Sequence, residues 1–155
     1  MAWQPLPNNQ LSHDDTYLFA REESKLLLKS MDSFAANFSA ANRDISDRNT
    51  ALAIGIMRDQ LDLFMQHTVY PTPEALYDLS LSLDGMGVDM NADVKQGNVL
   101  ALHLPLPHGF HVICSAEAVN STAAGEPTKD ILRLRFRDFL GNGRTHLNRY
   151  LMSRS

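Results

Sequence analysis

Hydrophobic residues recur every three or four positions through a long stretch near the start of the chain. Residues 13–69 include no proline and a single glycine, Gly55, which is typical of helical structure. Two apolar series run through it: Leu27, Met31, Phe34, Phe38, Ala41 and Ile45, then Ile54, Met57, Leu61 and Phe64. The two series are out of phase, and the polar segment between them, NRDISDRNT, is rich in helix-capping residues. We expect two helices, at about 13–41 and 45–68, with one continuous helix as the alternative.

The second expected helix carries apolar residues on two faces. At about 100° per residue, one broad face holds Ile54, Met57, Leu61 and Phe64, and the nearly opposite face holds Leu52, Ile56 and Leu63. A helix lying on a single core needs only one apolar face. We therefore expect the first helix to cover one face and a second copy of the chain to cover the other. The stripe from Ile54 to Phe64 is then an oligomer seam; the alternative is ordinary intramolecular core.

The hydrophobic period falls to two after Pro71 and Pro73, which end the helical stretch. Leucines alternate with other residues in NVLALHLPL (98–106), and HVICSAEAV (111–119) alternates in the same way. In DILRLRFRDF (130–139), the apolar positions are Leu132, Leu134 and Phe136, and the polar ones are Arg133, Arg135 and Arg137. This pattern is typical of half-buried strands. It predicts an antiparallel barrel or sandwich from about residue 76 to 140, followed by a final helix in THLNRYLMSR (145–154).

Together these patterns predict an α+β protein with three regions. Residues 1–12, with two prolines and two asparagines, are expected to be a flexible lead-in. Residues 13–69 are expected to be a helical, coiled-coil oligomerisation region, and residues 70–155 an antiparallel β-barrel domain with its C-terminal helix. The length of 155 residues and the hydrophobic content of 44% suit a globular chain of this size.

The charge distribution limits the partners that the chain can have. The net charge of −4 argues against nucleic-acid binding by general phosphate attraction. Residues 91–155 are locally basic, however, with eight basic and five acidic side chains. The arginine row at 133, 135 and 137 is either a solvated outer face with local ion pairs or a surface for an acidic partner or a phosphate.

The single cysteine, Cys114, excludes an intramolecular disulfide and zinc sites built from several cysteines. Its place in an alternating strand predicts a small core residue. The N-terminal segment has no secretory pattern, and no stretch approaches the roughly 18 consecutive apolar residues of a membrane span. The expected location is the cytoplasm.

Candidate catalytic and metal-binding residues are few. Three histidines cluster around one predicted hairpin turn: His103, His108 and His111. They could ligate a metal, but no carboxylate in the hairpin completes a ligand set. No carboxylate pair, catalytic triad or phosphate loop stands out. We expect no metal, no cofactor and no enzymatic activity.

The order of motifs after residue 75 resembles the PilZ family. The matching segments are LSLDGMGV (81–88), GNVLALHLPLP (97–107), CSAEAV (114–119), LRLRFRDF (132–139) and LNRYLMSR (147–154). Upstream, IMRDQLDLFMQ (56–66) is similar to the helix that precedes the barrel in some bacterial PilZ proteins. One subgroup of these assembles as a tetramer through a parallel coiled coil. The resemblance implies a β-barrel, signalling related to cyclic di-GMP, and four chains per assembly.

PilZ domains usually grip cyclic di-GMP with an R-x-x-x-R segment and a [D/N]-x-S-x-x-G turn. Here there is no arginine or lysine between His67 and Asp84, and the second motif survives only as Ser80, Ser82 and Gly85. Ser82 and Gly85 have the alternative role of shaping a turn. Each missing charge-assisted bond is worth about 1.5–3 kcal/mol, so we do not expect the usual nucleotide binding.

The functional expectation is therefore a non-enzymatic regulatory adaptor that acts through protein contacts in the control of motility, pili or virulence. The alternative is a genuine cyclic di-GMP receptor. Such a receptor would take its arginines from elsewhere, for example Arg133, Arg135 or a neighbouring subunit.

Overall fold

The structure, a computed structural model, describes residues 1–12, 15, 18–71, 77, 79–107, 109–125 and 131–154, without the side chains at 28, 31, 32, 34, 35 and 39. The chain divides into two compact units. One comprises Met1–Thr16 and Thr72–Ser155, and the other comprises Tyr17–Pro71. We describe each unit by itself.

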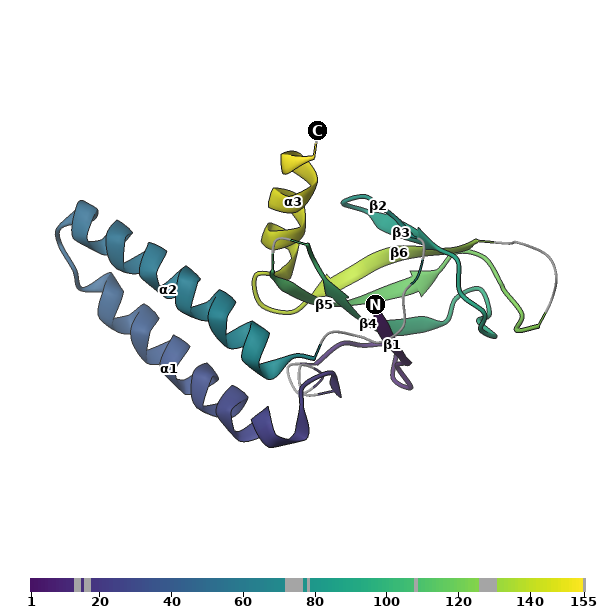
Figure 1. Cartoon of the computed structure of the whole chain (residues 1–155), viewed down its shortest axis with the longest axis horizontal. Helices are drawn as coiled ribbons and strands as arrows, with labels where there is room; N and C mark the ends of the chain where they lie inside the picture. Colours follow the sequence, from purple (N-terminus) through teal and green to yellow (C-terminus); the bar gives the residue numbers. More distant parts are fainter. Residues whose placement is uncertain are drawn as a thin grey trace. The chain divides into compact units, whose positions relative to one another are not determined.

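The first unit is built on a single antiparallel sheet (Figure 1). Its strands are β1 (Ala2–Pro5), β2 (Leu79–Leu81), β3 (Gly85–Val88), β4 (Val99–Pro105), β5 (His111–Ala118) and β6 (Leu132–Phe139), followed by helix α3 (Gly143–Ser153). The strand order is β1-β4-β5-β6-β3-β2, so β1 and β2 form the two edges of an open, curled sheet. The predicted α+β class, antiparallel strands and C-terminal helix are confirmed at this level.

Strand β6 shows why its sequence alternates. Leu132, Leu134 and Phe136 are buried in the hydrophobic core of the sheet, as predicted. The three arginines that alternate with them are exposed on the opposite face. Leu147 of α3 belongs to the same core and is fully buried. The final helix therefore packs Leu147 against the core face of the sheet.

Strands β4 and β5 are buried on both faces. Leu102 of β4 and Cys114 of β5 lie in the main core, which confirms the prediction for the cysteine. Ala101 and His103 point to the other face of β4, yet they too are 0% and 1% exposed. The alternation of leucine with small or polar residues in this hairpin therefore does not separate a core face from a solvent face.

The N-terminal residues differ from the flexible lead-in that we expected over 1–12. Ala2–Pro5 forms strand β1, which pairs with β4 in the register Ala2↔His103 to Pro5↔Leu100. The pairing covers an otherwise open edge of β4. Pro5 is tolerated because it ends an edge strand, where a missing N–H costs least.

The second unit is a pair of antiparallel helices (Figure 1). It contains a short 3₁₀ helix η2 (Glu22–Ser24), α1 (Lys25–Arg43) and α2 (Arg48–Val69). Two helices with a break were predicted, and the break is confirmed. Asp47 caps α2, because its side chain accepts hydrogen bonds from the Asn49 backbone N–H (3.1 Å) and the Thr50 hydroxyl (2.6 Å).

The start of the first helix was predicted too early, at about residue 13. Residues 13, 14, 16 and 17 lie outside the described part of the chain. Arg21 has an extended backbone, and its N–H donates to the Val69 carbonyl at the end of α2 (3.0 Å). This bond fixes the chain in a non-helical path just before η2. In the described part of the chain, no helix combines the length and apolar character needed to cross a membrane.

Candidate functional site

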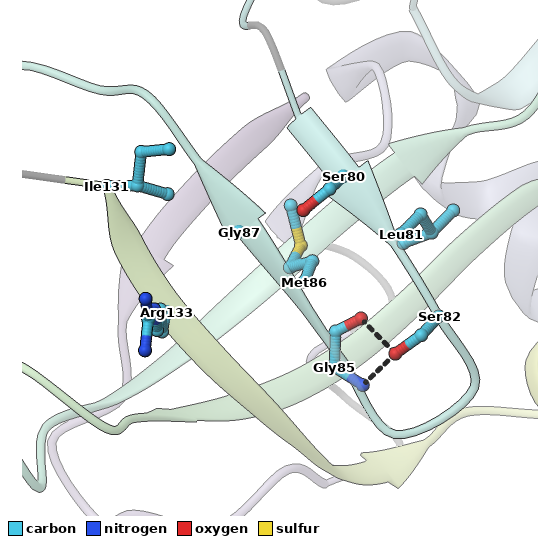
Figure 2. Close-up of a pocket in the computed structure, with 8 residues that line it drawn as sticks. All are labelled: Ser80, Leu81, Ser82, Gly85, Met86, Gly87, Ile131 and Arg133. Atoms are coloured by element: carbon cyan, nitrogen blue, oxygen red, sulfur yellow. Dashed lines mark hydrogen bonds between the residues drawn. The ribbon is translucent and has the colours of Figure 1, made fainter.

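A pocket of about 450 Å³ lies where β2, β3 and β6 run side by side (Figure 2). It is lined by Ser80, Leu81, Ser82, Gly85, Met86, Gly87, Ile131 and Arg133. All three residues of the degenerate nucleotide motif are in this set. So is Arg133, one of the three β6 arginines expected from the sequence as a possible anion or partner surface.

The strand register explains how these residues meet. Ser80 pairs with Gly87, and Gly87 pairs in turn with Arg133, so the three form one row across the sheet. Gly85 pairs with Arg135 in the next row of the same face. Because both β3 positions on this face are glycines, no β3 side chain separates Ser80 of β2 from the arginines of β6.

Ser82 closes the turn between β2 and β3. Its hydroxyl donates to the Gly85 carbonyl (3.0 Å) and accepts from the Gly85 N–H (3.2 Å), and its own N–H donates to the same carbonyl (2.9 Å). Both dashed bonds to its hydroxyl are visible in Figure 2. Ser82 therefore has a complete structural role in shaping the turn, which was the alternative interpretation of this residue.

Gly85 is required by the packing of the backbone. A Cβ at this position would lie 2.2 Å from the Leu134 carbonyl oxygen, so any side chain would force β3 away from β6. At Gly87 a Cβ would meet the Ser80 hydroxyl at 3.0 Å and an Ile131 methyl group at 3.1 Å. The two glycines of the motif region therefore follow from the fold itself.

The three arginines of β6 have different surroundings. Arg135 lies 3.5 Å from Glu117 on the neighbouring strand β5. Within the described residues, the Arg133 guanidinium makes no ion pair, and the Ser80 hydroxyl makes no hydrogen bond. Arg137 is exposed, but it does not line the pocket. Among the described residues, Arg133 and Ser80 are therefore pocket side chains whose polar groups are available to a ligand.

The predicted oligomer seam on α2 is largely exposed. Met57, Leu61 and Phe64 are 63%, 57% and 68% exposed, while Ile54 is half-buried. On the opposite apolar face, Leu52 and Ile56 are 62% and 53% exposed. Both apolar faces therefore remain open to solvent in the single chain.

We expected α1 to cover one of these faces, and it lies elsewhere. Arg58 of α2 stacks over the Phe38 ring of α1, with its guanidinium carbon 5.3 Å from the ring centroid. Asp62 lies one turn further along the same side of α2, and its burial raises the pKa of its carboxyl. The described contact between the two helices therefore involves a charged residue of α2 that lies between its apolar faces. Sequence periodicity did not indicate this contact, because charged residues are not expected to face a neighbouring helix.

Two of the three candidate metal-binding histidines pair with one another. The His103 Nε2 lies 2.7 Å from the His111 Nδ1, and their rings stack with centroids 5.0 Å apart. Burial, and secondarily the neighbouring His111, lowers the pKa of His103 to about 3. His108 lies outside the described residues. Among the residues that are described, no three His, Cys, Asp or Glu side chains are grouped to hold a metal ion.

The chain matches no protein-family model, and no curated protein or solved structure is similar to it. The resemblance to PilZ domains therefore rests on the sequence motifs given above.

Proposed function

We propose that this chain is a non-enzymatic regulatory adaptor with an atypical PilZ-like domain. It acts through protein contacts in signalling related to cyclic di-GMP, in the control of motility, pili or virulence. It works as a homo-oligomer, most simply a tetramer. Its single, buried cysteine suits a reducing compartment such as the cytoplasm.

The observation that carries this proposal is the pair of exposed apolar faces on α2. Large apolar side chains that are more than half exposed are uncommon in groups on a monomeric surface, and such patches mark interaction sites. Here Met57, Leu61 and Phe64 follow one another at three- and four-residue steps. They stay exposed beside α1, whose described contact with α2 is the one between Phe38 and Arg58. Burying them against further copies or a partner is favourable at about 25 cal/mol per Å² of apolar surface.

The pocket on the β-domain supports a role without the usual nucleotide. The Ser82 hydroxyl already makes hydrogen bonds with the Gly85 backbone. A glycine is required at position 85 because a Cβ there would collide with the Leu134 carbonyl oxygen. Ser80 stands where the nucleotide motif has an acidic or amide side chain. Among the described residues that line the pocket, a dianionic dinucleotide would find one arginine, Arg133, in place of an arginine pair.

A second candidate function, a genuine cyclic di-GMP receptor, is favoured by one observation. Arg133 lines the same pocket as Ser80, Ser82 and Gly85. An arginine from β6 therefore lies beside the serine-and-glycine turn, where the missing arginine segment would have contributed its charge. A neighbouring subunit would have to supply the second arginine.

Titration calorimetry with cyclic di-GMP separates the two functions. We expect no binding tighter than about 10 μM, even at low salt, where charge contacts are least screened. The matched variant is Arg133→Ala. A sub-micromolar isotherm that Arg133→Ala abolishes would replace the adaptor with the receptor.

A further inference from the structure

We propose that the pocket between β2, β3 and β6 binds an acidic side chain of a partner protein, with Arg133 and Ser80 holding its carboxylate. This inference rests on the proposed adaptor function and names the chemistry of the partner. Figure 2 shows the two residues on opposite sides of β3, with Gly87 between them.

Charge is the first argument. The chain as a whole has a net charge of −4, yet β6 presents three exposed arginines on one face. Only Arg135 has an acidic neighbour within ion-pair distance among the described residues, Glu117 at 3.5 Å. An acidic partner is attracted to this face and repelled by the rest of the surface. Such an arrangement orients a complex and raises its association rate.

The geometry of the pocket sets the number of anions that it takes. The Arg133 guanidinium presents a planar fork that fits one carboxylate. The Ser80 hydroxyl, in the same cross-strand row, can donate one further hydrogen bond. Arg133 is the arginine that lines the pocket, and it makes no ion pair with the described residues. A single carboxylate can accept hydrogen bonds from both the Arg133 guanidinium and the Ser80 hydroxyl. Two phosphates would carry more negative charge than one guanidinium can neutralise.

The surroundings of the pocket suit a polypeptide. Ile131, which is 52% exposed, lies against Gly87 and provides an apolar contact beside the charged group. In the sheet formed by the described residues, β2 is an edge strand that pairs with β3. An extended segment can therefore lie along this edge without displacing any strand, with an acidic side chain directed into the pocket.

Fluorescence anisotropy with two synthetic peptides tests the proposal on the full chain. The probe is a labelled peptide of alternating glutamate and leucine, and its control has glutamine at every glutamate position. We expect the glutamate peptide to bind and the glutamine peptide not to bind. Arg133→Ala should weaken binding about tenfold, which equals about 1.4 kcal/mol. Arg149→Ala removes the same charge from the exposed side of α3 and should change the affinity less than about twofold.

Three results would overturn the inference: equal binding of both peptides, no effect of Arg133→Ala, or equal losses from Arg133→Ala and Arg149→Ala. Circular dichroism of each variant establishes that it is folded. Cyclic di-GMP is added as a competitor in the same assay. If it displaces the peptide at sub-micromolar concentration, the adaptor function itself fails. If neither ligand binds, this inference fails, and the adaptor proposal still stands on the exposed faces of α2.

Discussion

The Nε2 of His103 and the Nδ1 of His111 lie 2.7 Å apart, and both side chains are buried on the face of the β4–β5 hairpin opposite the main core. At this distance one ring nitrogen donates to the other, which requires that the accepting imidazole be neutral. Both rings cannot be protonated while this bond is kept. Burial is the main reason that the pKa of His103 is lowered to about 3, and the neighbouring His111 lowers it further.

This pair predicts a loss of stability in mild acid. The pKa of His103 is about 3 in the folded chain and 6.5 ordinarily, so the unfolded chain binds the proton more readily between these values. The contribution to stability is complete above about pH 6.5 and is lost as the pH falls towards 3. Between pH 6.5 and 5 the free energy of unfolding should fall by about 2 kcal/mol. Urea unfolding can be followed by the fluorescence of Trp3, the single tryptophan, which pairs with Leu102 in β4.

The variant His103→Gln should have a shallower dependence of stability on pH over the same range. His67→Gln serves as the control, because His67 is exposed on α2. This variant should leave unchanged the pH dependence of the unfolding free energy, measured by Trp3 fluorescence. If wild type and His103→Gln lose stability in parallel between pH 6.5 and 5, the buried pair is not the cause.

Two neighbouring substitutions on β6 should differ sharply in their effect. Leu134 is 3% exposed in the core, so Leu134→Ala should lower the free energy of unfolding by about 2–5 kcal/mol. Arg135 is exposed, and its contact with Glu117 is a surface ion pair. Arg135→Ala should therefore cost less than about 1 kcal/mol. Urea denaturation of the two variants measures both values, and similar losses would contradict the inward orientation of Leu134.

Two glycine-to-alanine substitutions should have effects of opposite sign. A Cβ at Gly85 would lie 2.2 Å from the Leu134 carbonyl oxygen, so Gly85→Ala should destabilise the β-domain by at least about 2 kcal/mol. Gly55 lies within α2, and a Cβ there would meet nothing within 4 Å. Gly55→Ala should stabilise the helix by about 1 kcal/mol. Thermal unfolding provides the comparison, and an unchanged stability of Gly85→Ala would contradict the close backbone contact at this glycine.

An element of the fold could be predicted from the sequence where residues within that element determine it, and not where contacts with distant residues do. Strand β6 was identified because one of its faces meets the core at Leu134 and the other meets water at Arg135, so its sequence alternates. Strand β1 was missed because AWQP has no alternation. It becomes a strand only through its pairing with β4, a segment almost a hundred residues away. The burial of His103 could not be predicted for a similar reason. No local sequence pattern shows that both faces of β4 are covered.

The same limit applies to the candidate site. Ser80, Ser82 and Gly85 are close in sequence, so a motif identified them together. Arg133 joins them only through the register Gly87↔Arg133, and without that register it was one arginine in a row of three. On α2 the periodicity indicated both apolar faces, but it did not indicate the contact between Arg58 and Phe38 of α1. That contact depends on the tertiary packing of the two helices.

The last prediction concerns self-association through α2. Leu61 and Phe64 are 57% and 68% exposed, and the double variant Leu61→Glu, Phe64→Glu would place two charges in the centre of the proposed seam. Burying unpaired carboxylates there is strongly unfavourable, so light scattering should show several chains for the intact protein and a monomer for the variant.

The matched control adds the same two charges to α1, at positions where the side chain is already exposed, Ser33→Glu and Asn37→Glu. This variant should keep the oligomer, because α1 uses another surface to pack on α2. The comparison separates a specific seam from a general effect of net charge, which both variants make more negative by the same amount. If the intact protein is a stable monomer at tens of micromolar, the seam does not exist. The exposed stripe on α2 would then need a partner of a different kind. If the control dissociates together with the seam variant, charge repulsion explains both results, and α2 has no special role.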